Sequence, residues 1–259
     1  MLEAVTFDFW ETLARDSAEN LRRTRELRIE GLRRVLRGAG FDHPREALEA
    51  AHEESMRRIA AVWGTGKDVG TDGQVAIVLE CLGPSLPGAL DGAVRPALEE
   101  AYATPALISP PAIRPGSEQA LWALRDRGIR IGLISNTGRT PGRVLRVILQ
   151  RAGLLEHFEA LTFSDEAGIR KPDPRVFRWT LNKLGSHPER AAHVGDDLEA
   201  DVGGARAAGL RGIHVANVRA APEPDLGGGA AGLIVPDATI RSFEELLPAL
   251  EPFGLPPVC

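Results

Sequence analysis

The sequence contains few cysteines, no long apolar run and no excess of basic residues. Its two cysteines, Cys81 and Cys259, lie far apart in a chain of 259 residues, which argues against a disulfide framework and is typical of a reducing compartment. No apolar run is long enough to span a membrane, and no basic segment precedes the first strand, so we expect neither a membrane anchor nor a signal peptide. The net charge of −5 gives no reason to expect a nucleic-acid partner. We therefore expect a cytoplasmic protein with no nucleic-acid or membrane partner.

Lysine is also scarce, with three copies against 28 arginines. Because the chain uses arginine for its general surface charge, each lysine stands out. Lys171 lies in a loop bounded by Pro172 and Pro174, where it could be an ordinary surface residue. Its rarity instead favours a function that requires a compact point charge.

Strands and helices alternate along most of the chain. The pattern predicts strands at about 4–8, 129–134, 160–163, 191–194, 212–216 and 238–240, with a loop at 219–232 and helices at 117–128, 141–152, 174–184, 197–208 and 242–250. Such alternation predicts a parallel sheet with right-handed crossovers. The fold class is therefore α/β, with a Rossmann-like core and a second, smaller α-helical domain.

That second domain is expected between the first two strands. Helices are predicted at 18–37, 44–62, 72–82 and 88–103, separated by glycines and prolines, with no convincing strand among them. Four prolines between Pro105 and Pro115 indicate a stiff linker that returns to the core. We therefore assign residues 1–16 and 108–259 to the core and residues 17–107 to a helical insert.

The first helix of the insert is rich in arginine. We interpret these side chains as a solvated face stabilised by Glu26 and Glu30. An anion-binding face above the active site is the alternative. The arginines are Arg22, Arg23, Arg25, Arg28, Arg33, Arg34 and Arg37.

Polar residues follow the predicted strands at their carboxyl ends. Asp8 follows the first strand, Ser135 and Asn136 follow the second, and an acidic group follows the strand at 191–194. The carboxyl ends of parallel strands share one edge of the sheet, which is where ligands bind. Asp8 could instead be a turn residue, and Asp196-Asp197 a pair that caps a helix. The acidic group consists of Asp196, Asp197 and Asp201.

In this order and spacing, the stretches around Asp8, Ser135-Asn136, Arg170-Lys171-Pro172 and Gly195-Asp196-Asp197 resemble the haloacid dehalogenase superfamily of hydrolases. The resemblance covers residues 1–15 and about 110–250. An insert after the first stretch resembles the helical cap domain of one branch of that superfamily.

The resemblance implies a role for each of these residues. Asp8 would attack phosphorus and form an aspartyl-phosphate, and Lys171 would neutralise it. Ser135 and the backbone N–H of Asn136 would hold a phosphate oxygen. Asp8, Asp196 and the backbone carbonyl of Trp10 would bind Mg²⁺. Asp197 and Asp201 would act around the metal or orient Lys171.

The sequence departs from the phosphatase pattern at two positions. Phosphatases of the superfamily usually carry a second aspartate two residues after the nucleophile, where this chain has Trp10, and a glycine at the next position, where it has Glu11. Trp10 cannot act as a general acid, whose loss typically costs ~10²–10⁴-fold in rate. Glu11 could substitute only if its side chain pointed toward the site, which adjacent residues usually do not.

Trp10 therefore leaves three interpretations. The first is a Mg²⁺-dependent hydrolase of small phosphomonoesters, which the carboxylate cluster favours because it is costly without a cation. The second is a 2-haloacid dehalogenase in which Asp8 attacks carbon without a metal. The third is a phosphate-binding or interaction protein without turnover, against which the presence of Asp8, Lys171 and Asp196 argues.

Overall fold

The computed structural model describes residues 1–90, 92–216 and 234–258. Six parallel strands form the main sheet, in the order β5-β4-β1-β6-β7-β8. They are β1 (Ala4–Phe7), β4 (Arg130–Ser135), β5 (Ala160–Phe163), β6 (Ala191–Gly195), β7 (Arg211–Val215) and β8 (Ala238–Ile240). This parallel α/β sheet confirms the fold class expected from the sequence.

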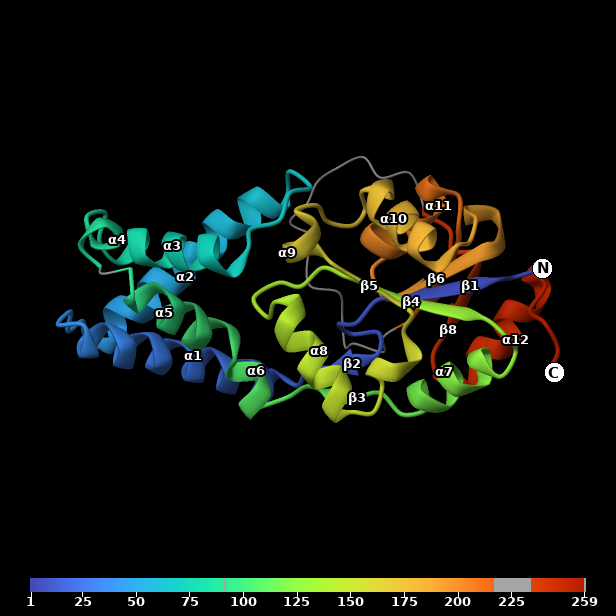
Figure 1. The fold of residues 1–259 in the computed structure, drawn as a ribbon, viewed down its shortest axis with the longest axis horizontal. Coiled ribbons are helices and arrows are strands. Elements are labelled where there is room, and N and C mark those ends of the chain that lie inside the picture. The colour runs from blue at the N-terminus through green and yellow to red at the C-terminus, as the bar shows by residue number, and fades with distance from the viewer. Residues whose placement is uncertain (91, 217–233, 259) are drawn as a thin grey trace.

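Helices cover both faces of the sheet (Figure 1). Val5 and Phe7 of β1 pack in one apolar cluster with α7 (Ser117–Arg125), α8 (Gly142–Arg151) and α12 (Leu246–Leu250). Ala4 packs in a second cluster with α10 (Pro174–Leu184) and α11 (Gly204–Ala208). Successive strand residues point to opposite faces, so one short apolar strand supplies both layers.

Local signals set the helix that follows the Lys171 loop. The Asp173 carboxylate accepts a hydrogen bond from the Arg175 N–H at 2.9 Å and caps α10, and Pro174 occupies the first turn, where its missing N–H costs nothing. Gly185, with φ of 62°, ends the helix. The loop that carries Lys171 is therefore anchored at its carboxyl end by a well-defined helix.

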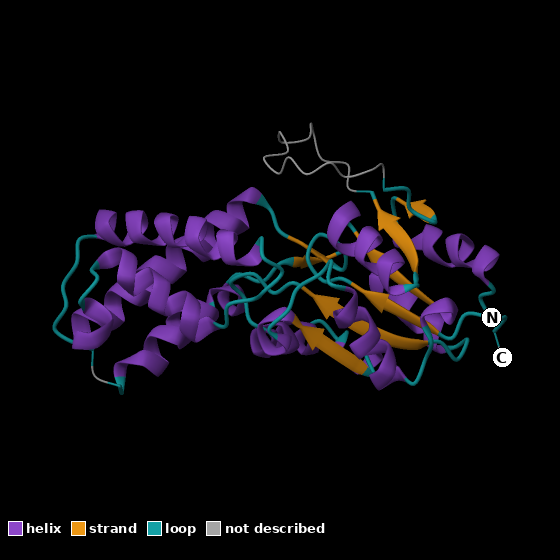
Figure 2. Cartoon of the chain, turned by 90° about the horizontal axis from the view of Figure 1, so that it is seen from above, coloured by secondary structure: helices purple, strands orange, loops and turns teal. Residues whose placement is uncertain are grey.

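The helices between β2 and β3 form a separate helical region, residues 17–108, beside the sheet region (Figures 1 and 2). It contains α1 (Ala18–Gly38), α2 (Arg45–Trp63), α3 (Thr71–Leu82), α4 (Leu86–Ala89), α5 (Val94–Ala103) and α6 (Pro105–Ile108). The helical region has its own apolar cluster, which includes Ile29, Leu48, Leu79 and Tyr102. The prediction of a single helix at 88–103 is wrong, because this stretch contains parts of two helices, α4 and α5.

The two connections between the regions pair with each other. β2 (Ala14–Arg15) lies antiparallel to β3 (Ala112–Ile113), and the Arg114 N–H donates to the Leu13 carbonyl at 2.9 Å. The prediction of a stiff linker from Pro105 to Pro115 is only partly correct. Pro105 begins α6, and the residues that follow include the strand β3. The segment that leads into the helical region and the segment that leads out of it therefore run side by side.

Shorter elements complete the fold. A π-helical segment, η3 (Leu198–Gly203), precedes α11 where one helix was expected, and η4 (Phe243–Glu245) precedes α12. The remaining short elements are η1 (Leu155–His157), α9 (Ser164–Ala167), η2 (Pro188–Arg190) and η5 (Glu251–Phe253). The loop expected at 219–232 lies outside the described residues. Among the helices of the described ranges, none combines the length and apolar character needed to cross a bilayer.

Candidate functional site

Asp8 lies at the point where the strand order of the sheet reverses. β1 pairs with β4 on one side and with β6 on the other, and Asp8 directly follows β1. The Asp8 N–H donates to the Val194 carbonyl at 2.9 Å, which fixes the backbone there. This topological switch point is the usual ligand position in an open parallel sheet.

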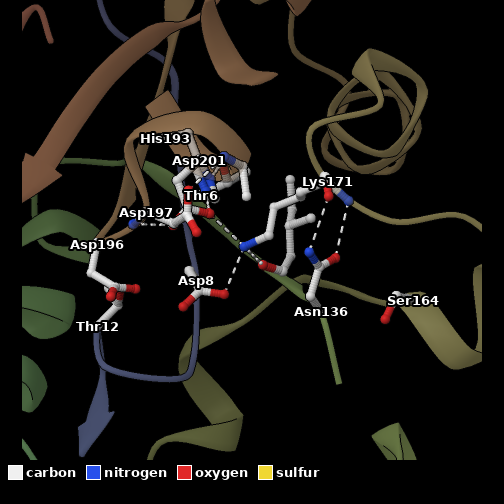
Figure 3. A network of polar contacts seen from close by, with 12 residues as sticks. Thr6, Asp8, Thr12, Asn136, Ser164, Lys171, His193, Asp196, Asp197 and Asp201 are labelled. Atoms are coloured by element: carbon white, nitrogen blue, oxygen red, sulfur yellow. Dashed lines mark hydrogen bonds and ion pairs between the residues drawn. The ribbon is translucent and has the colours of Figure 1, made fainter. Parts of the chain in front are cut away.

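Lys171 contacts Asp8 directly (Figure 3). Its Nζ donates to Asp8 Oδ1 at 2.6 Å, to Asp201 Oδ1 at 2.6 Å and to the Ile134 carbonyl at 2.8 Å. Burial lowers the pKa of Lys171, but the charges of Asp201 and Asp8 outweigh this effect and the net pKa is raised. The lysine is therefore a fully hydrogen-bonded, buried cation between two carboxylates.

The Asn136 side chain holds the backbone of Lys171. Its Oδ1 accepts from the Lys171 N–H at 3.0 Å, and its Nδ2 donates to the Lys171 carbonyl at 3.1 Å. The resemblance implied a role only for the backbone N–H of Asn136. The amide side chain thus positions the loop in addition.

Ser135 ends β4 beside this network. The side chain is 1% exposed, and its Oγ has no hydrogen-bond partner among the residues that the structure describes. A buried hydroxyl without a partner is costly in free energy unless a ligand supplies one. Ser135 therefore has a hydroxyl available for an oxygen of a bound anion.

Three carboxylates gather around the lysine. Oxygen atoms of Asp8, Asp196 and Asp201 lie within 4.8 Å of one another, and Lys171 is the one cation bonded to Asp8 and Asp201 in the described residues. Burial raises the pKa of Asp8 to about 7, against the opposing charge of Lys171. Burial, followed by the charges of Asp8 and Asp201, raises the pKa of Asp196 to about 8. With all three carboxylates ionised, the group of four side chains carries an excess of two negative charges.

This donor set fits Mg²⁺. The ion prefers carboxylate oxygens, and its two positive charges equal the excess negative charge of the cluster. Both Asp201 oxygens already accept hydrogen bonds, Oδ1 from Lys171 and Oδ2 from the Asp197 N–H at 3.0 Å. Asp8 and Asp196 are therefore the better side-chain candidates for the metal, and Asp201 is better placed to orient Lys171.

Asp197 caps the segment that follows it. Its Oδ1 accepts from the N–H groups of Glu199 and Ala200, both at 2.8 Å, and so caps the π-helical segment η3. Asp201, not Asp197, contacts Lys171 in the described stretches of the chain. The capping interpretation of the Asp196-Asp197 pair thus applies to Asp197.

Two buried residues behind the site were not anticipated. His193 Nε2 lies 3.1 Å from Asp201 Oδ1, and His193 Nδ1 lies 2.8 Å from Thr6 Oγ1. Burial lowers the pKa of His193, so the ring is neutral, with Nε2–H donating to Asp201 and Nδ1 accepting from the threonine. A polar residue in the middle of each of two buried strands was the signal in the sequence.

Glu11 does not point into the cluster. Its carboxylate accepts from the Asp16 N–H and from Arg15 Nε, both at 3.4 Å. Its backbone has φ of 56°, the left-handed conformation that glycine adopts most readily, which explains why a glycine suits this position. Trp10 packs edge-on against Phe9, with ring centroids 4.9 Å apart, and lines a cavity next to the site.

Comparisons with known proteins point to one family. The family model of haloacid dehalogenase-like hydrolases matches residues 2–209. Haloacid dehalogenase-like hydrolase domain-containing protein 3 of Bos taurus is 35% identical over 159 residues, which are 61% of this chain and 60% of that protein. A phosphoserine phosphatase of Thermus thermophilus is 45% identical over 101 residues, 39% of each chain. The chain thus spans about 60% of the length of the first relative and less of the second.

Solved structures share the fold. A 2-haloacid dehalogenase from Pseudomonas syringae has a TM-score of 0.68 at 23% identity, with 98% of this chain and all of that chain covered. A HAD phosphatase from Thermococcus onnurineus has a TM-score of 0.59 at 23% identity, with 98% and 99% covered. At these identities the likeness concerns the fold alone. Since the family model spans well over half of the chain, the protein belongs to the haloacid dehalogenase-like hydrolases.

Proposed function

We propose that this hydrolase cleaves phosphomonoesters of small molecules in a Mg²⁺-dependent reaction, with Asp8 as the nucleophile. The observation that carries the proposal is the charge of the cluster, in which Asp8, Asp196 and Asp201 surround Lys171. A cluster of this kind is costly without a further cation, and a phosphate substrate needs the same cation. Relatives named phosphoserine phosphatase and phosphoglycolate phosphatase support a phosphate ester as the substrate.

In the proposed first step, an Asp8 oxygen attacks phosphorus and the bond to the ester oxygen breaks, which leaves an aspartyl-phosphate. Lys171 neutralises the attacking carboxylate and the transferring group. The Ser135 hydroxyl and the Asn136 N–H bind a phosphate oxygen. Asp8, Asp196 and the Trp10 carbonyl would hold the metal, which supplies charge neutralisation when bound.

In the second step, water attacks phosphorus of the aspartyl-phosphate and restores Asp8. An aspartate two residues after the nucleophile would normally protonate the leaving group and then activate this water, but that position is Trp10. Glu11 is turned toward Arg15 and Asp16. We therefore propose that the leaving group departs without protonation by either residue, so substrates with acidic leaving groups react fastest.

We propose that residues 17–107 act as a cap domain over a core of residues 1–16 and 108–259. The paired connections β2 and β3 attach the helical region to the sheet region through a narrow junction. Helical residues also line the cavity next to Trp10. A cap in this position would exclude water from the site during phosphoryl transfer.

Dehalogenation of 2-haloacids is the second candidate function. Trp10 favours it, because a departing halide needs no proton and an apolar side chain lines the cavity at the acid position. The excess of carboxylates argues against it, because attack on carbon by Asp8 requires no metal. The two functions therefore differ in their response to a chelator.

A panel of aryl phosphates, alkyl phosphates and 2-haloacids, assayed with Mg²⁺ and with excess EDTA, tests the proposal. We expect hydrolysis of phosphates only with Mg²⁺, and kcat for aryl phosphates above that for alkyl phosphates by ~10²-fold or more. Asp196→Ala should abolish the binding of Mg²⁺ in calorimetry. Undiminished phosphate hydrolysis in EDTA would refute the proposal, and release of halide in EDTA would establish the dehalogenase instead.

A further inference from the structure

The arginine-rich helix α1 has two different faces. On one face, Arg23 and Arg33 pair with Glu26 and Glu30 at 4.0 and 3.6 Å. This is the solvated face expected from the sequence. Arg25 and Arg28 lie on another face, one turn apart, and line a cavity between the helical and sheet regions. The interpretation as a solvated arginine face therefore holds for the face with Arg23 and Arg33, and not for the face with Arg25 and Arg28.

The cavity lies next to the proposed phosphate site, since residues of its wall directly follow site residues in the chain. Its volume is about 510 Å³. Its wall on the sheet side comes from Trp10, two residues after Asp8, and from residues 137–140, which directly follow Ser135 and Asn136. Its opposite wall is α1, which Figure 1 shows running away from β2 into the helical region. A molecule bound at Asp8 can therefore extend into this space.

Two guanidinium groups meet in the cavity wall around Tyr102. Arg28 is 4% exposed, donates from Nε to the Tyr102 carbonyl at 2.8 Å, and lies 5.0 Å from the centroid of its ring. Arg139 forms a hydrogen bond with the Tyr102 side chain, whose hydroxyl donates to Gln74 Oε1 at 3.0 Å. Burial lowers the pKa of Arg28 to about 10, so the group stays charged. The two cations are thus fixed in place by neutral partners.

No direct ion pair neutralises this charge in the described residues, and the acid whose pKa the charge of Arg25 helps to lower, Glu49, is itself paired with Arg45 at 2.7 Å. Arg25, Arg28 and Arg139 form no ion pair there. Asp16 lines the cavity but accepts a hydrogen bond from Asn20. Burying cations without a carboxylate is costly in free energy.

A buried imidazole adds a second sign of an absent partner. His52 is 1% exposed, and its Nε2 has no hydrogen-bond partner among the described residues. Burial, and then the charges of Arg139, Arg28 and Arg25, lower the pKa of His52 to about 3, so the ring stays neutral. The Arg139 Nε is likewise buried and without a partner in the described ranges. The region therefore holds buried nitrogen atoms without partners, and positive charge without a direct ion pair, in the part of the chain that the structure describes.

We propose that this cavity binds a second anionic group of the substrate, a carboxylate or a phosphate, with Arg25, Arg28 and Arg139 as its ligands. Guanidinium groups bind both anions through paired hydrogen bonds. The inference rests on the proposed phosphomonoester hydrolysis, which places the first phosphate at Asp8. The substrate class is then a phosphorylated organic acid or a bisphosphate.

The other residues of the cavity lining indicate what kind of substrate body would fit between the two anions. Trp10, Leu21, Met56, Trp63 and Ala106 contribute apolar surface to its lining. Such a wall binds an aromatic or aliphatic body better than a polyhydroxylated one, whose hydroxyls would lose their hydrogen bonds to water. The substrate is therefore apolar between its two anionic groups.

Matched substrates test the second anion. 4-(Carboxymethyl)phenyl phosphate and its methyl ester have similar leaving groups and differ in one negative charge, and 1,4-phenylene bisphosphate replaces the carboxylate by phosphate. We expect kcat/KM for the carboxylate probe to exceed that of its ester by about 10-fold to 100-fold. The bisphosphate probe shows which anion the cavity prefers. Equal values for the acid, the ester and the bisphosphate would overturn the inference.

Variants of the three arginines test whether they cause the preference for the carboxylate probe over its ester. Arg25→Met, Arg28→Met and Arg139→Met should each reduce the ratio of kcat/KM between acid and ester by about tenfold. Arg139→Lys keeps the charge and should have a smaller effect. Arg23→Met lies on the paired face of the same helix and should leave the ratio unchanged. Arg25 is only half-buried, so Arg25→Met keeps the test valid if Arg28→Met fails to fold.

A binding measurement separates this inference from the proposed function. 4-Hydroxyphenylacetate carries the carboxylate without the phosphate, and calorimetry with Asp8→Asn protein excludes turnover. Binding of 4-hydroxyphenylacetate that is lost in Arg25→Met supports the anion site. If no phosphate ester is hydrolysed in the same experiments, only the proposed function fails. Absence of binding, together with hydrolysis that ignores the second charge, overturns the anion site and leaves the proposed function intact.

Discussion

At the scale of single residues, the site is a set of like charges held close together. Asp196 shows this most clearly, because burial and the charges of Asp8, Asp201 and Asp197 all raise its pKa. Thr12 donates a hydrogen bond to its Oδ1 at 3.4 Å, and His214 Nε2 lies 3.1 Å from its carbonyl. These bonds hold the residue where its charge is unfavourable in the absence of a cation. Such a position is expected of a residue selected for function rather than for stability.

Asp196→Asn should therefore stabilise the metal-free protein and remove its stabilisation by Mg²⁺. The folded-state pKa of about 8 lies above the unfolded value of 3.8, so the wild type loses stability as the pH rises between these values. The variant lacks this loss. We expect its advantage in unfolding free energy to reach ~1–3 kcal/mol at pH 9 and to be smaller at pH 6.

Urea denaturation in EDTA at both pH values measures this difference. Glu199→Gln is the control, because it removes an exposed carboxylate three residues away in the same segment. An Asp196→Asn protein that is less stable than the wild type at pH 9 would contradict the account of charge in the cluster.

At the scale of elements, the register between β1 and β6 builds the support of the site. Thr6 lies directly opposite His193 in the parallel pair, and their contact continues through Asp201 to Lys171. All four side chains are buried. Two strands therefore orient the lysine that a loop supplies.

His193→Leu should lower the unfolding free energy by ~2–3 kcal/mol, because buried Asp201 loses a hydrogen bond and the Thr6 hydroxyl keeps only its longer bond to the Ala192 carbonyl, at 3.4 Å. Thr6→Val should cost less. Since the two residues share one hydrogen bond, the double variant should be less destabilised than the sum of the single variants, by ~1 kcal/mol. Denaturant titration of all four proteins measures this coupling, and strictly additive effects would show that the bond contributes nothing.

Elements with their own pattern could be predicted from the sequence, and elements made by tertiary contacts could not. The strand at 160–163 and the helix at 174–184 have the bounds expected, because an apolar run and the Asp173-Pro174 cap define them locally. The pair β2–β3 consists of two residues on each strand, too few for any periodicity. Its two strands lie far apart in the sequence, so no local pattern indicates that they pair.

The same division applies to the site. The meeting of Asp8 and Lys171 follows from the rule that strand ends converge at one edge. The polar residues Thr6 and His193 could have been noticed in the strands, but their partners depend on register. The burial of Arg28 could not be predicted, since an arginine-rich helix looks alike on its solvated and buried faces.

At the scale of the whole molecule, another contact joins the two regions close to the loop that carries Lys171. Asp68, in the loop between α2 and α3, accepts hydrogen bonds from Arg170 Nη1 at 2.7 Å and from Trp63 Nε1 at 3.0 Å. The Arg170 guanidinium lies 4.4 Å from the centroid of the Trp63 ring, and its backbone N–H donates to the Gly66 carbonyl at 3.0 Å. Because Arg170 precedes Lys171, this contact couples the position of the helical region to the site.

Asp68→Asn should loosen this contact and weaken substrate binding. The Asp68 side chain is fully buried and that of Arg170 is 11% exposed, so the variant leaves a largely buried guanidinium without its countercharge. Burial lowers the pKa of Arg170, and the charge and hydrogen bond of Asp68 oppose this effect. We expect faster hydrogen exchange at residues 66–70 and 168–170, and a KM raised by ~10-fold with a smaller change in kcat.

Glu166→Gln is the control, because it removes an ion pair to Arg146 that lies wholly within the sheet region. If both variants gave the same exchange and the same KM, the Asp68–Arg170 pair would be an ordinary ion pair, and the helical region would be positioned by its other contacts, such as the β2–β3 pair and the Gln74–Gly138 hydrogen bond.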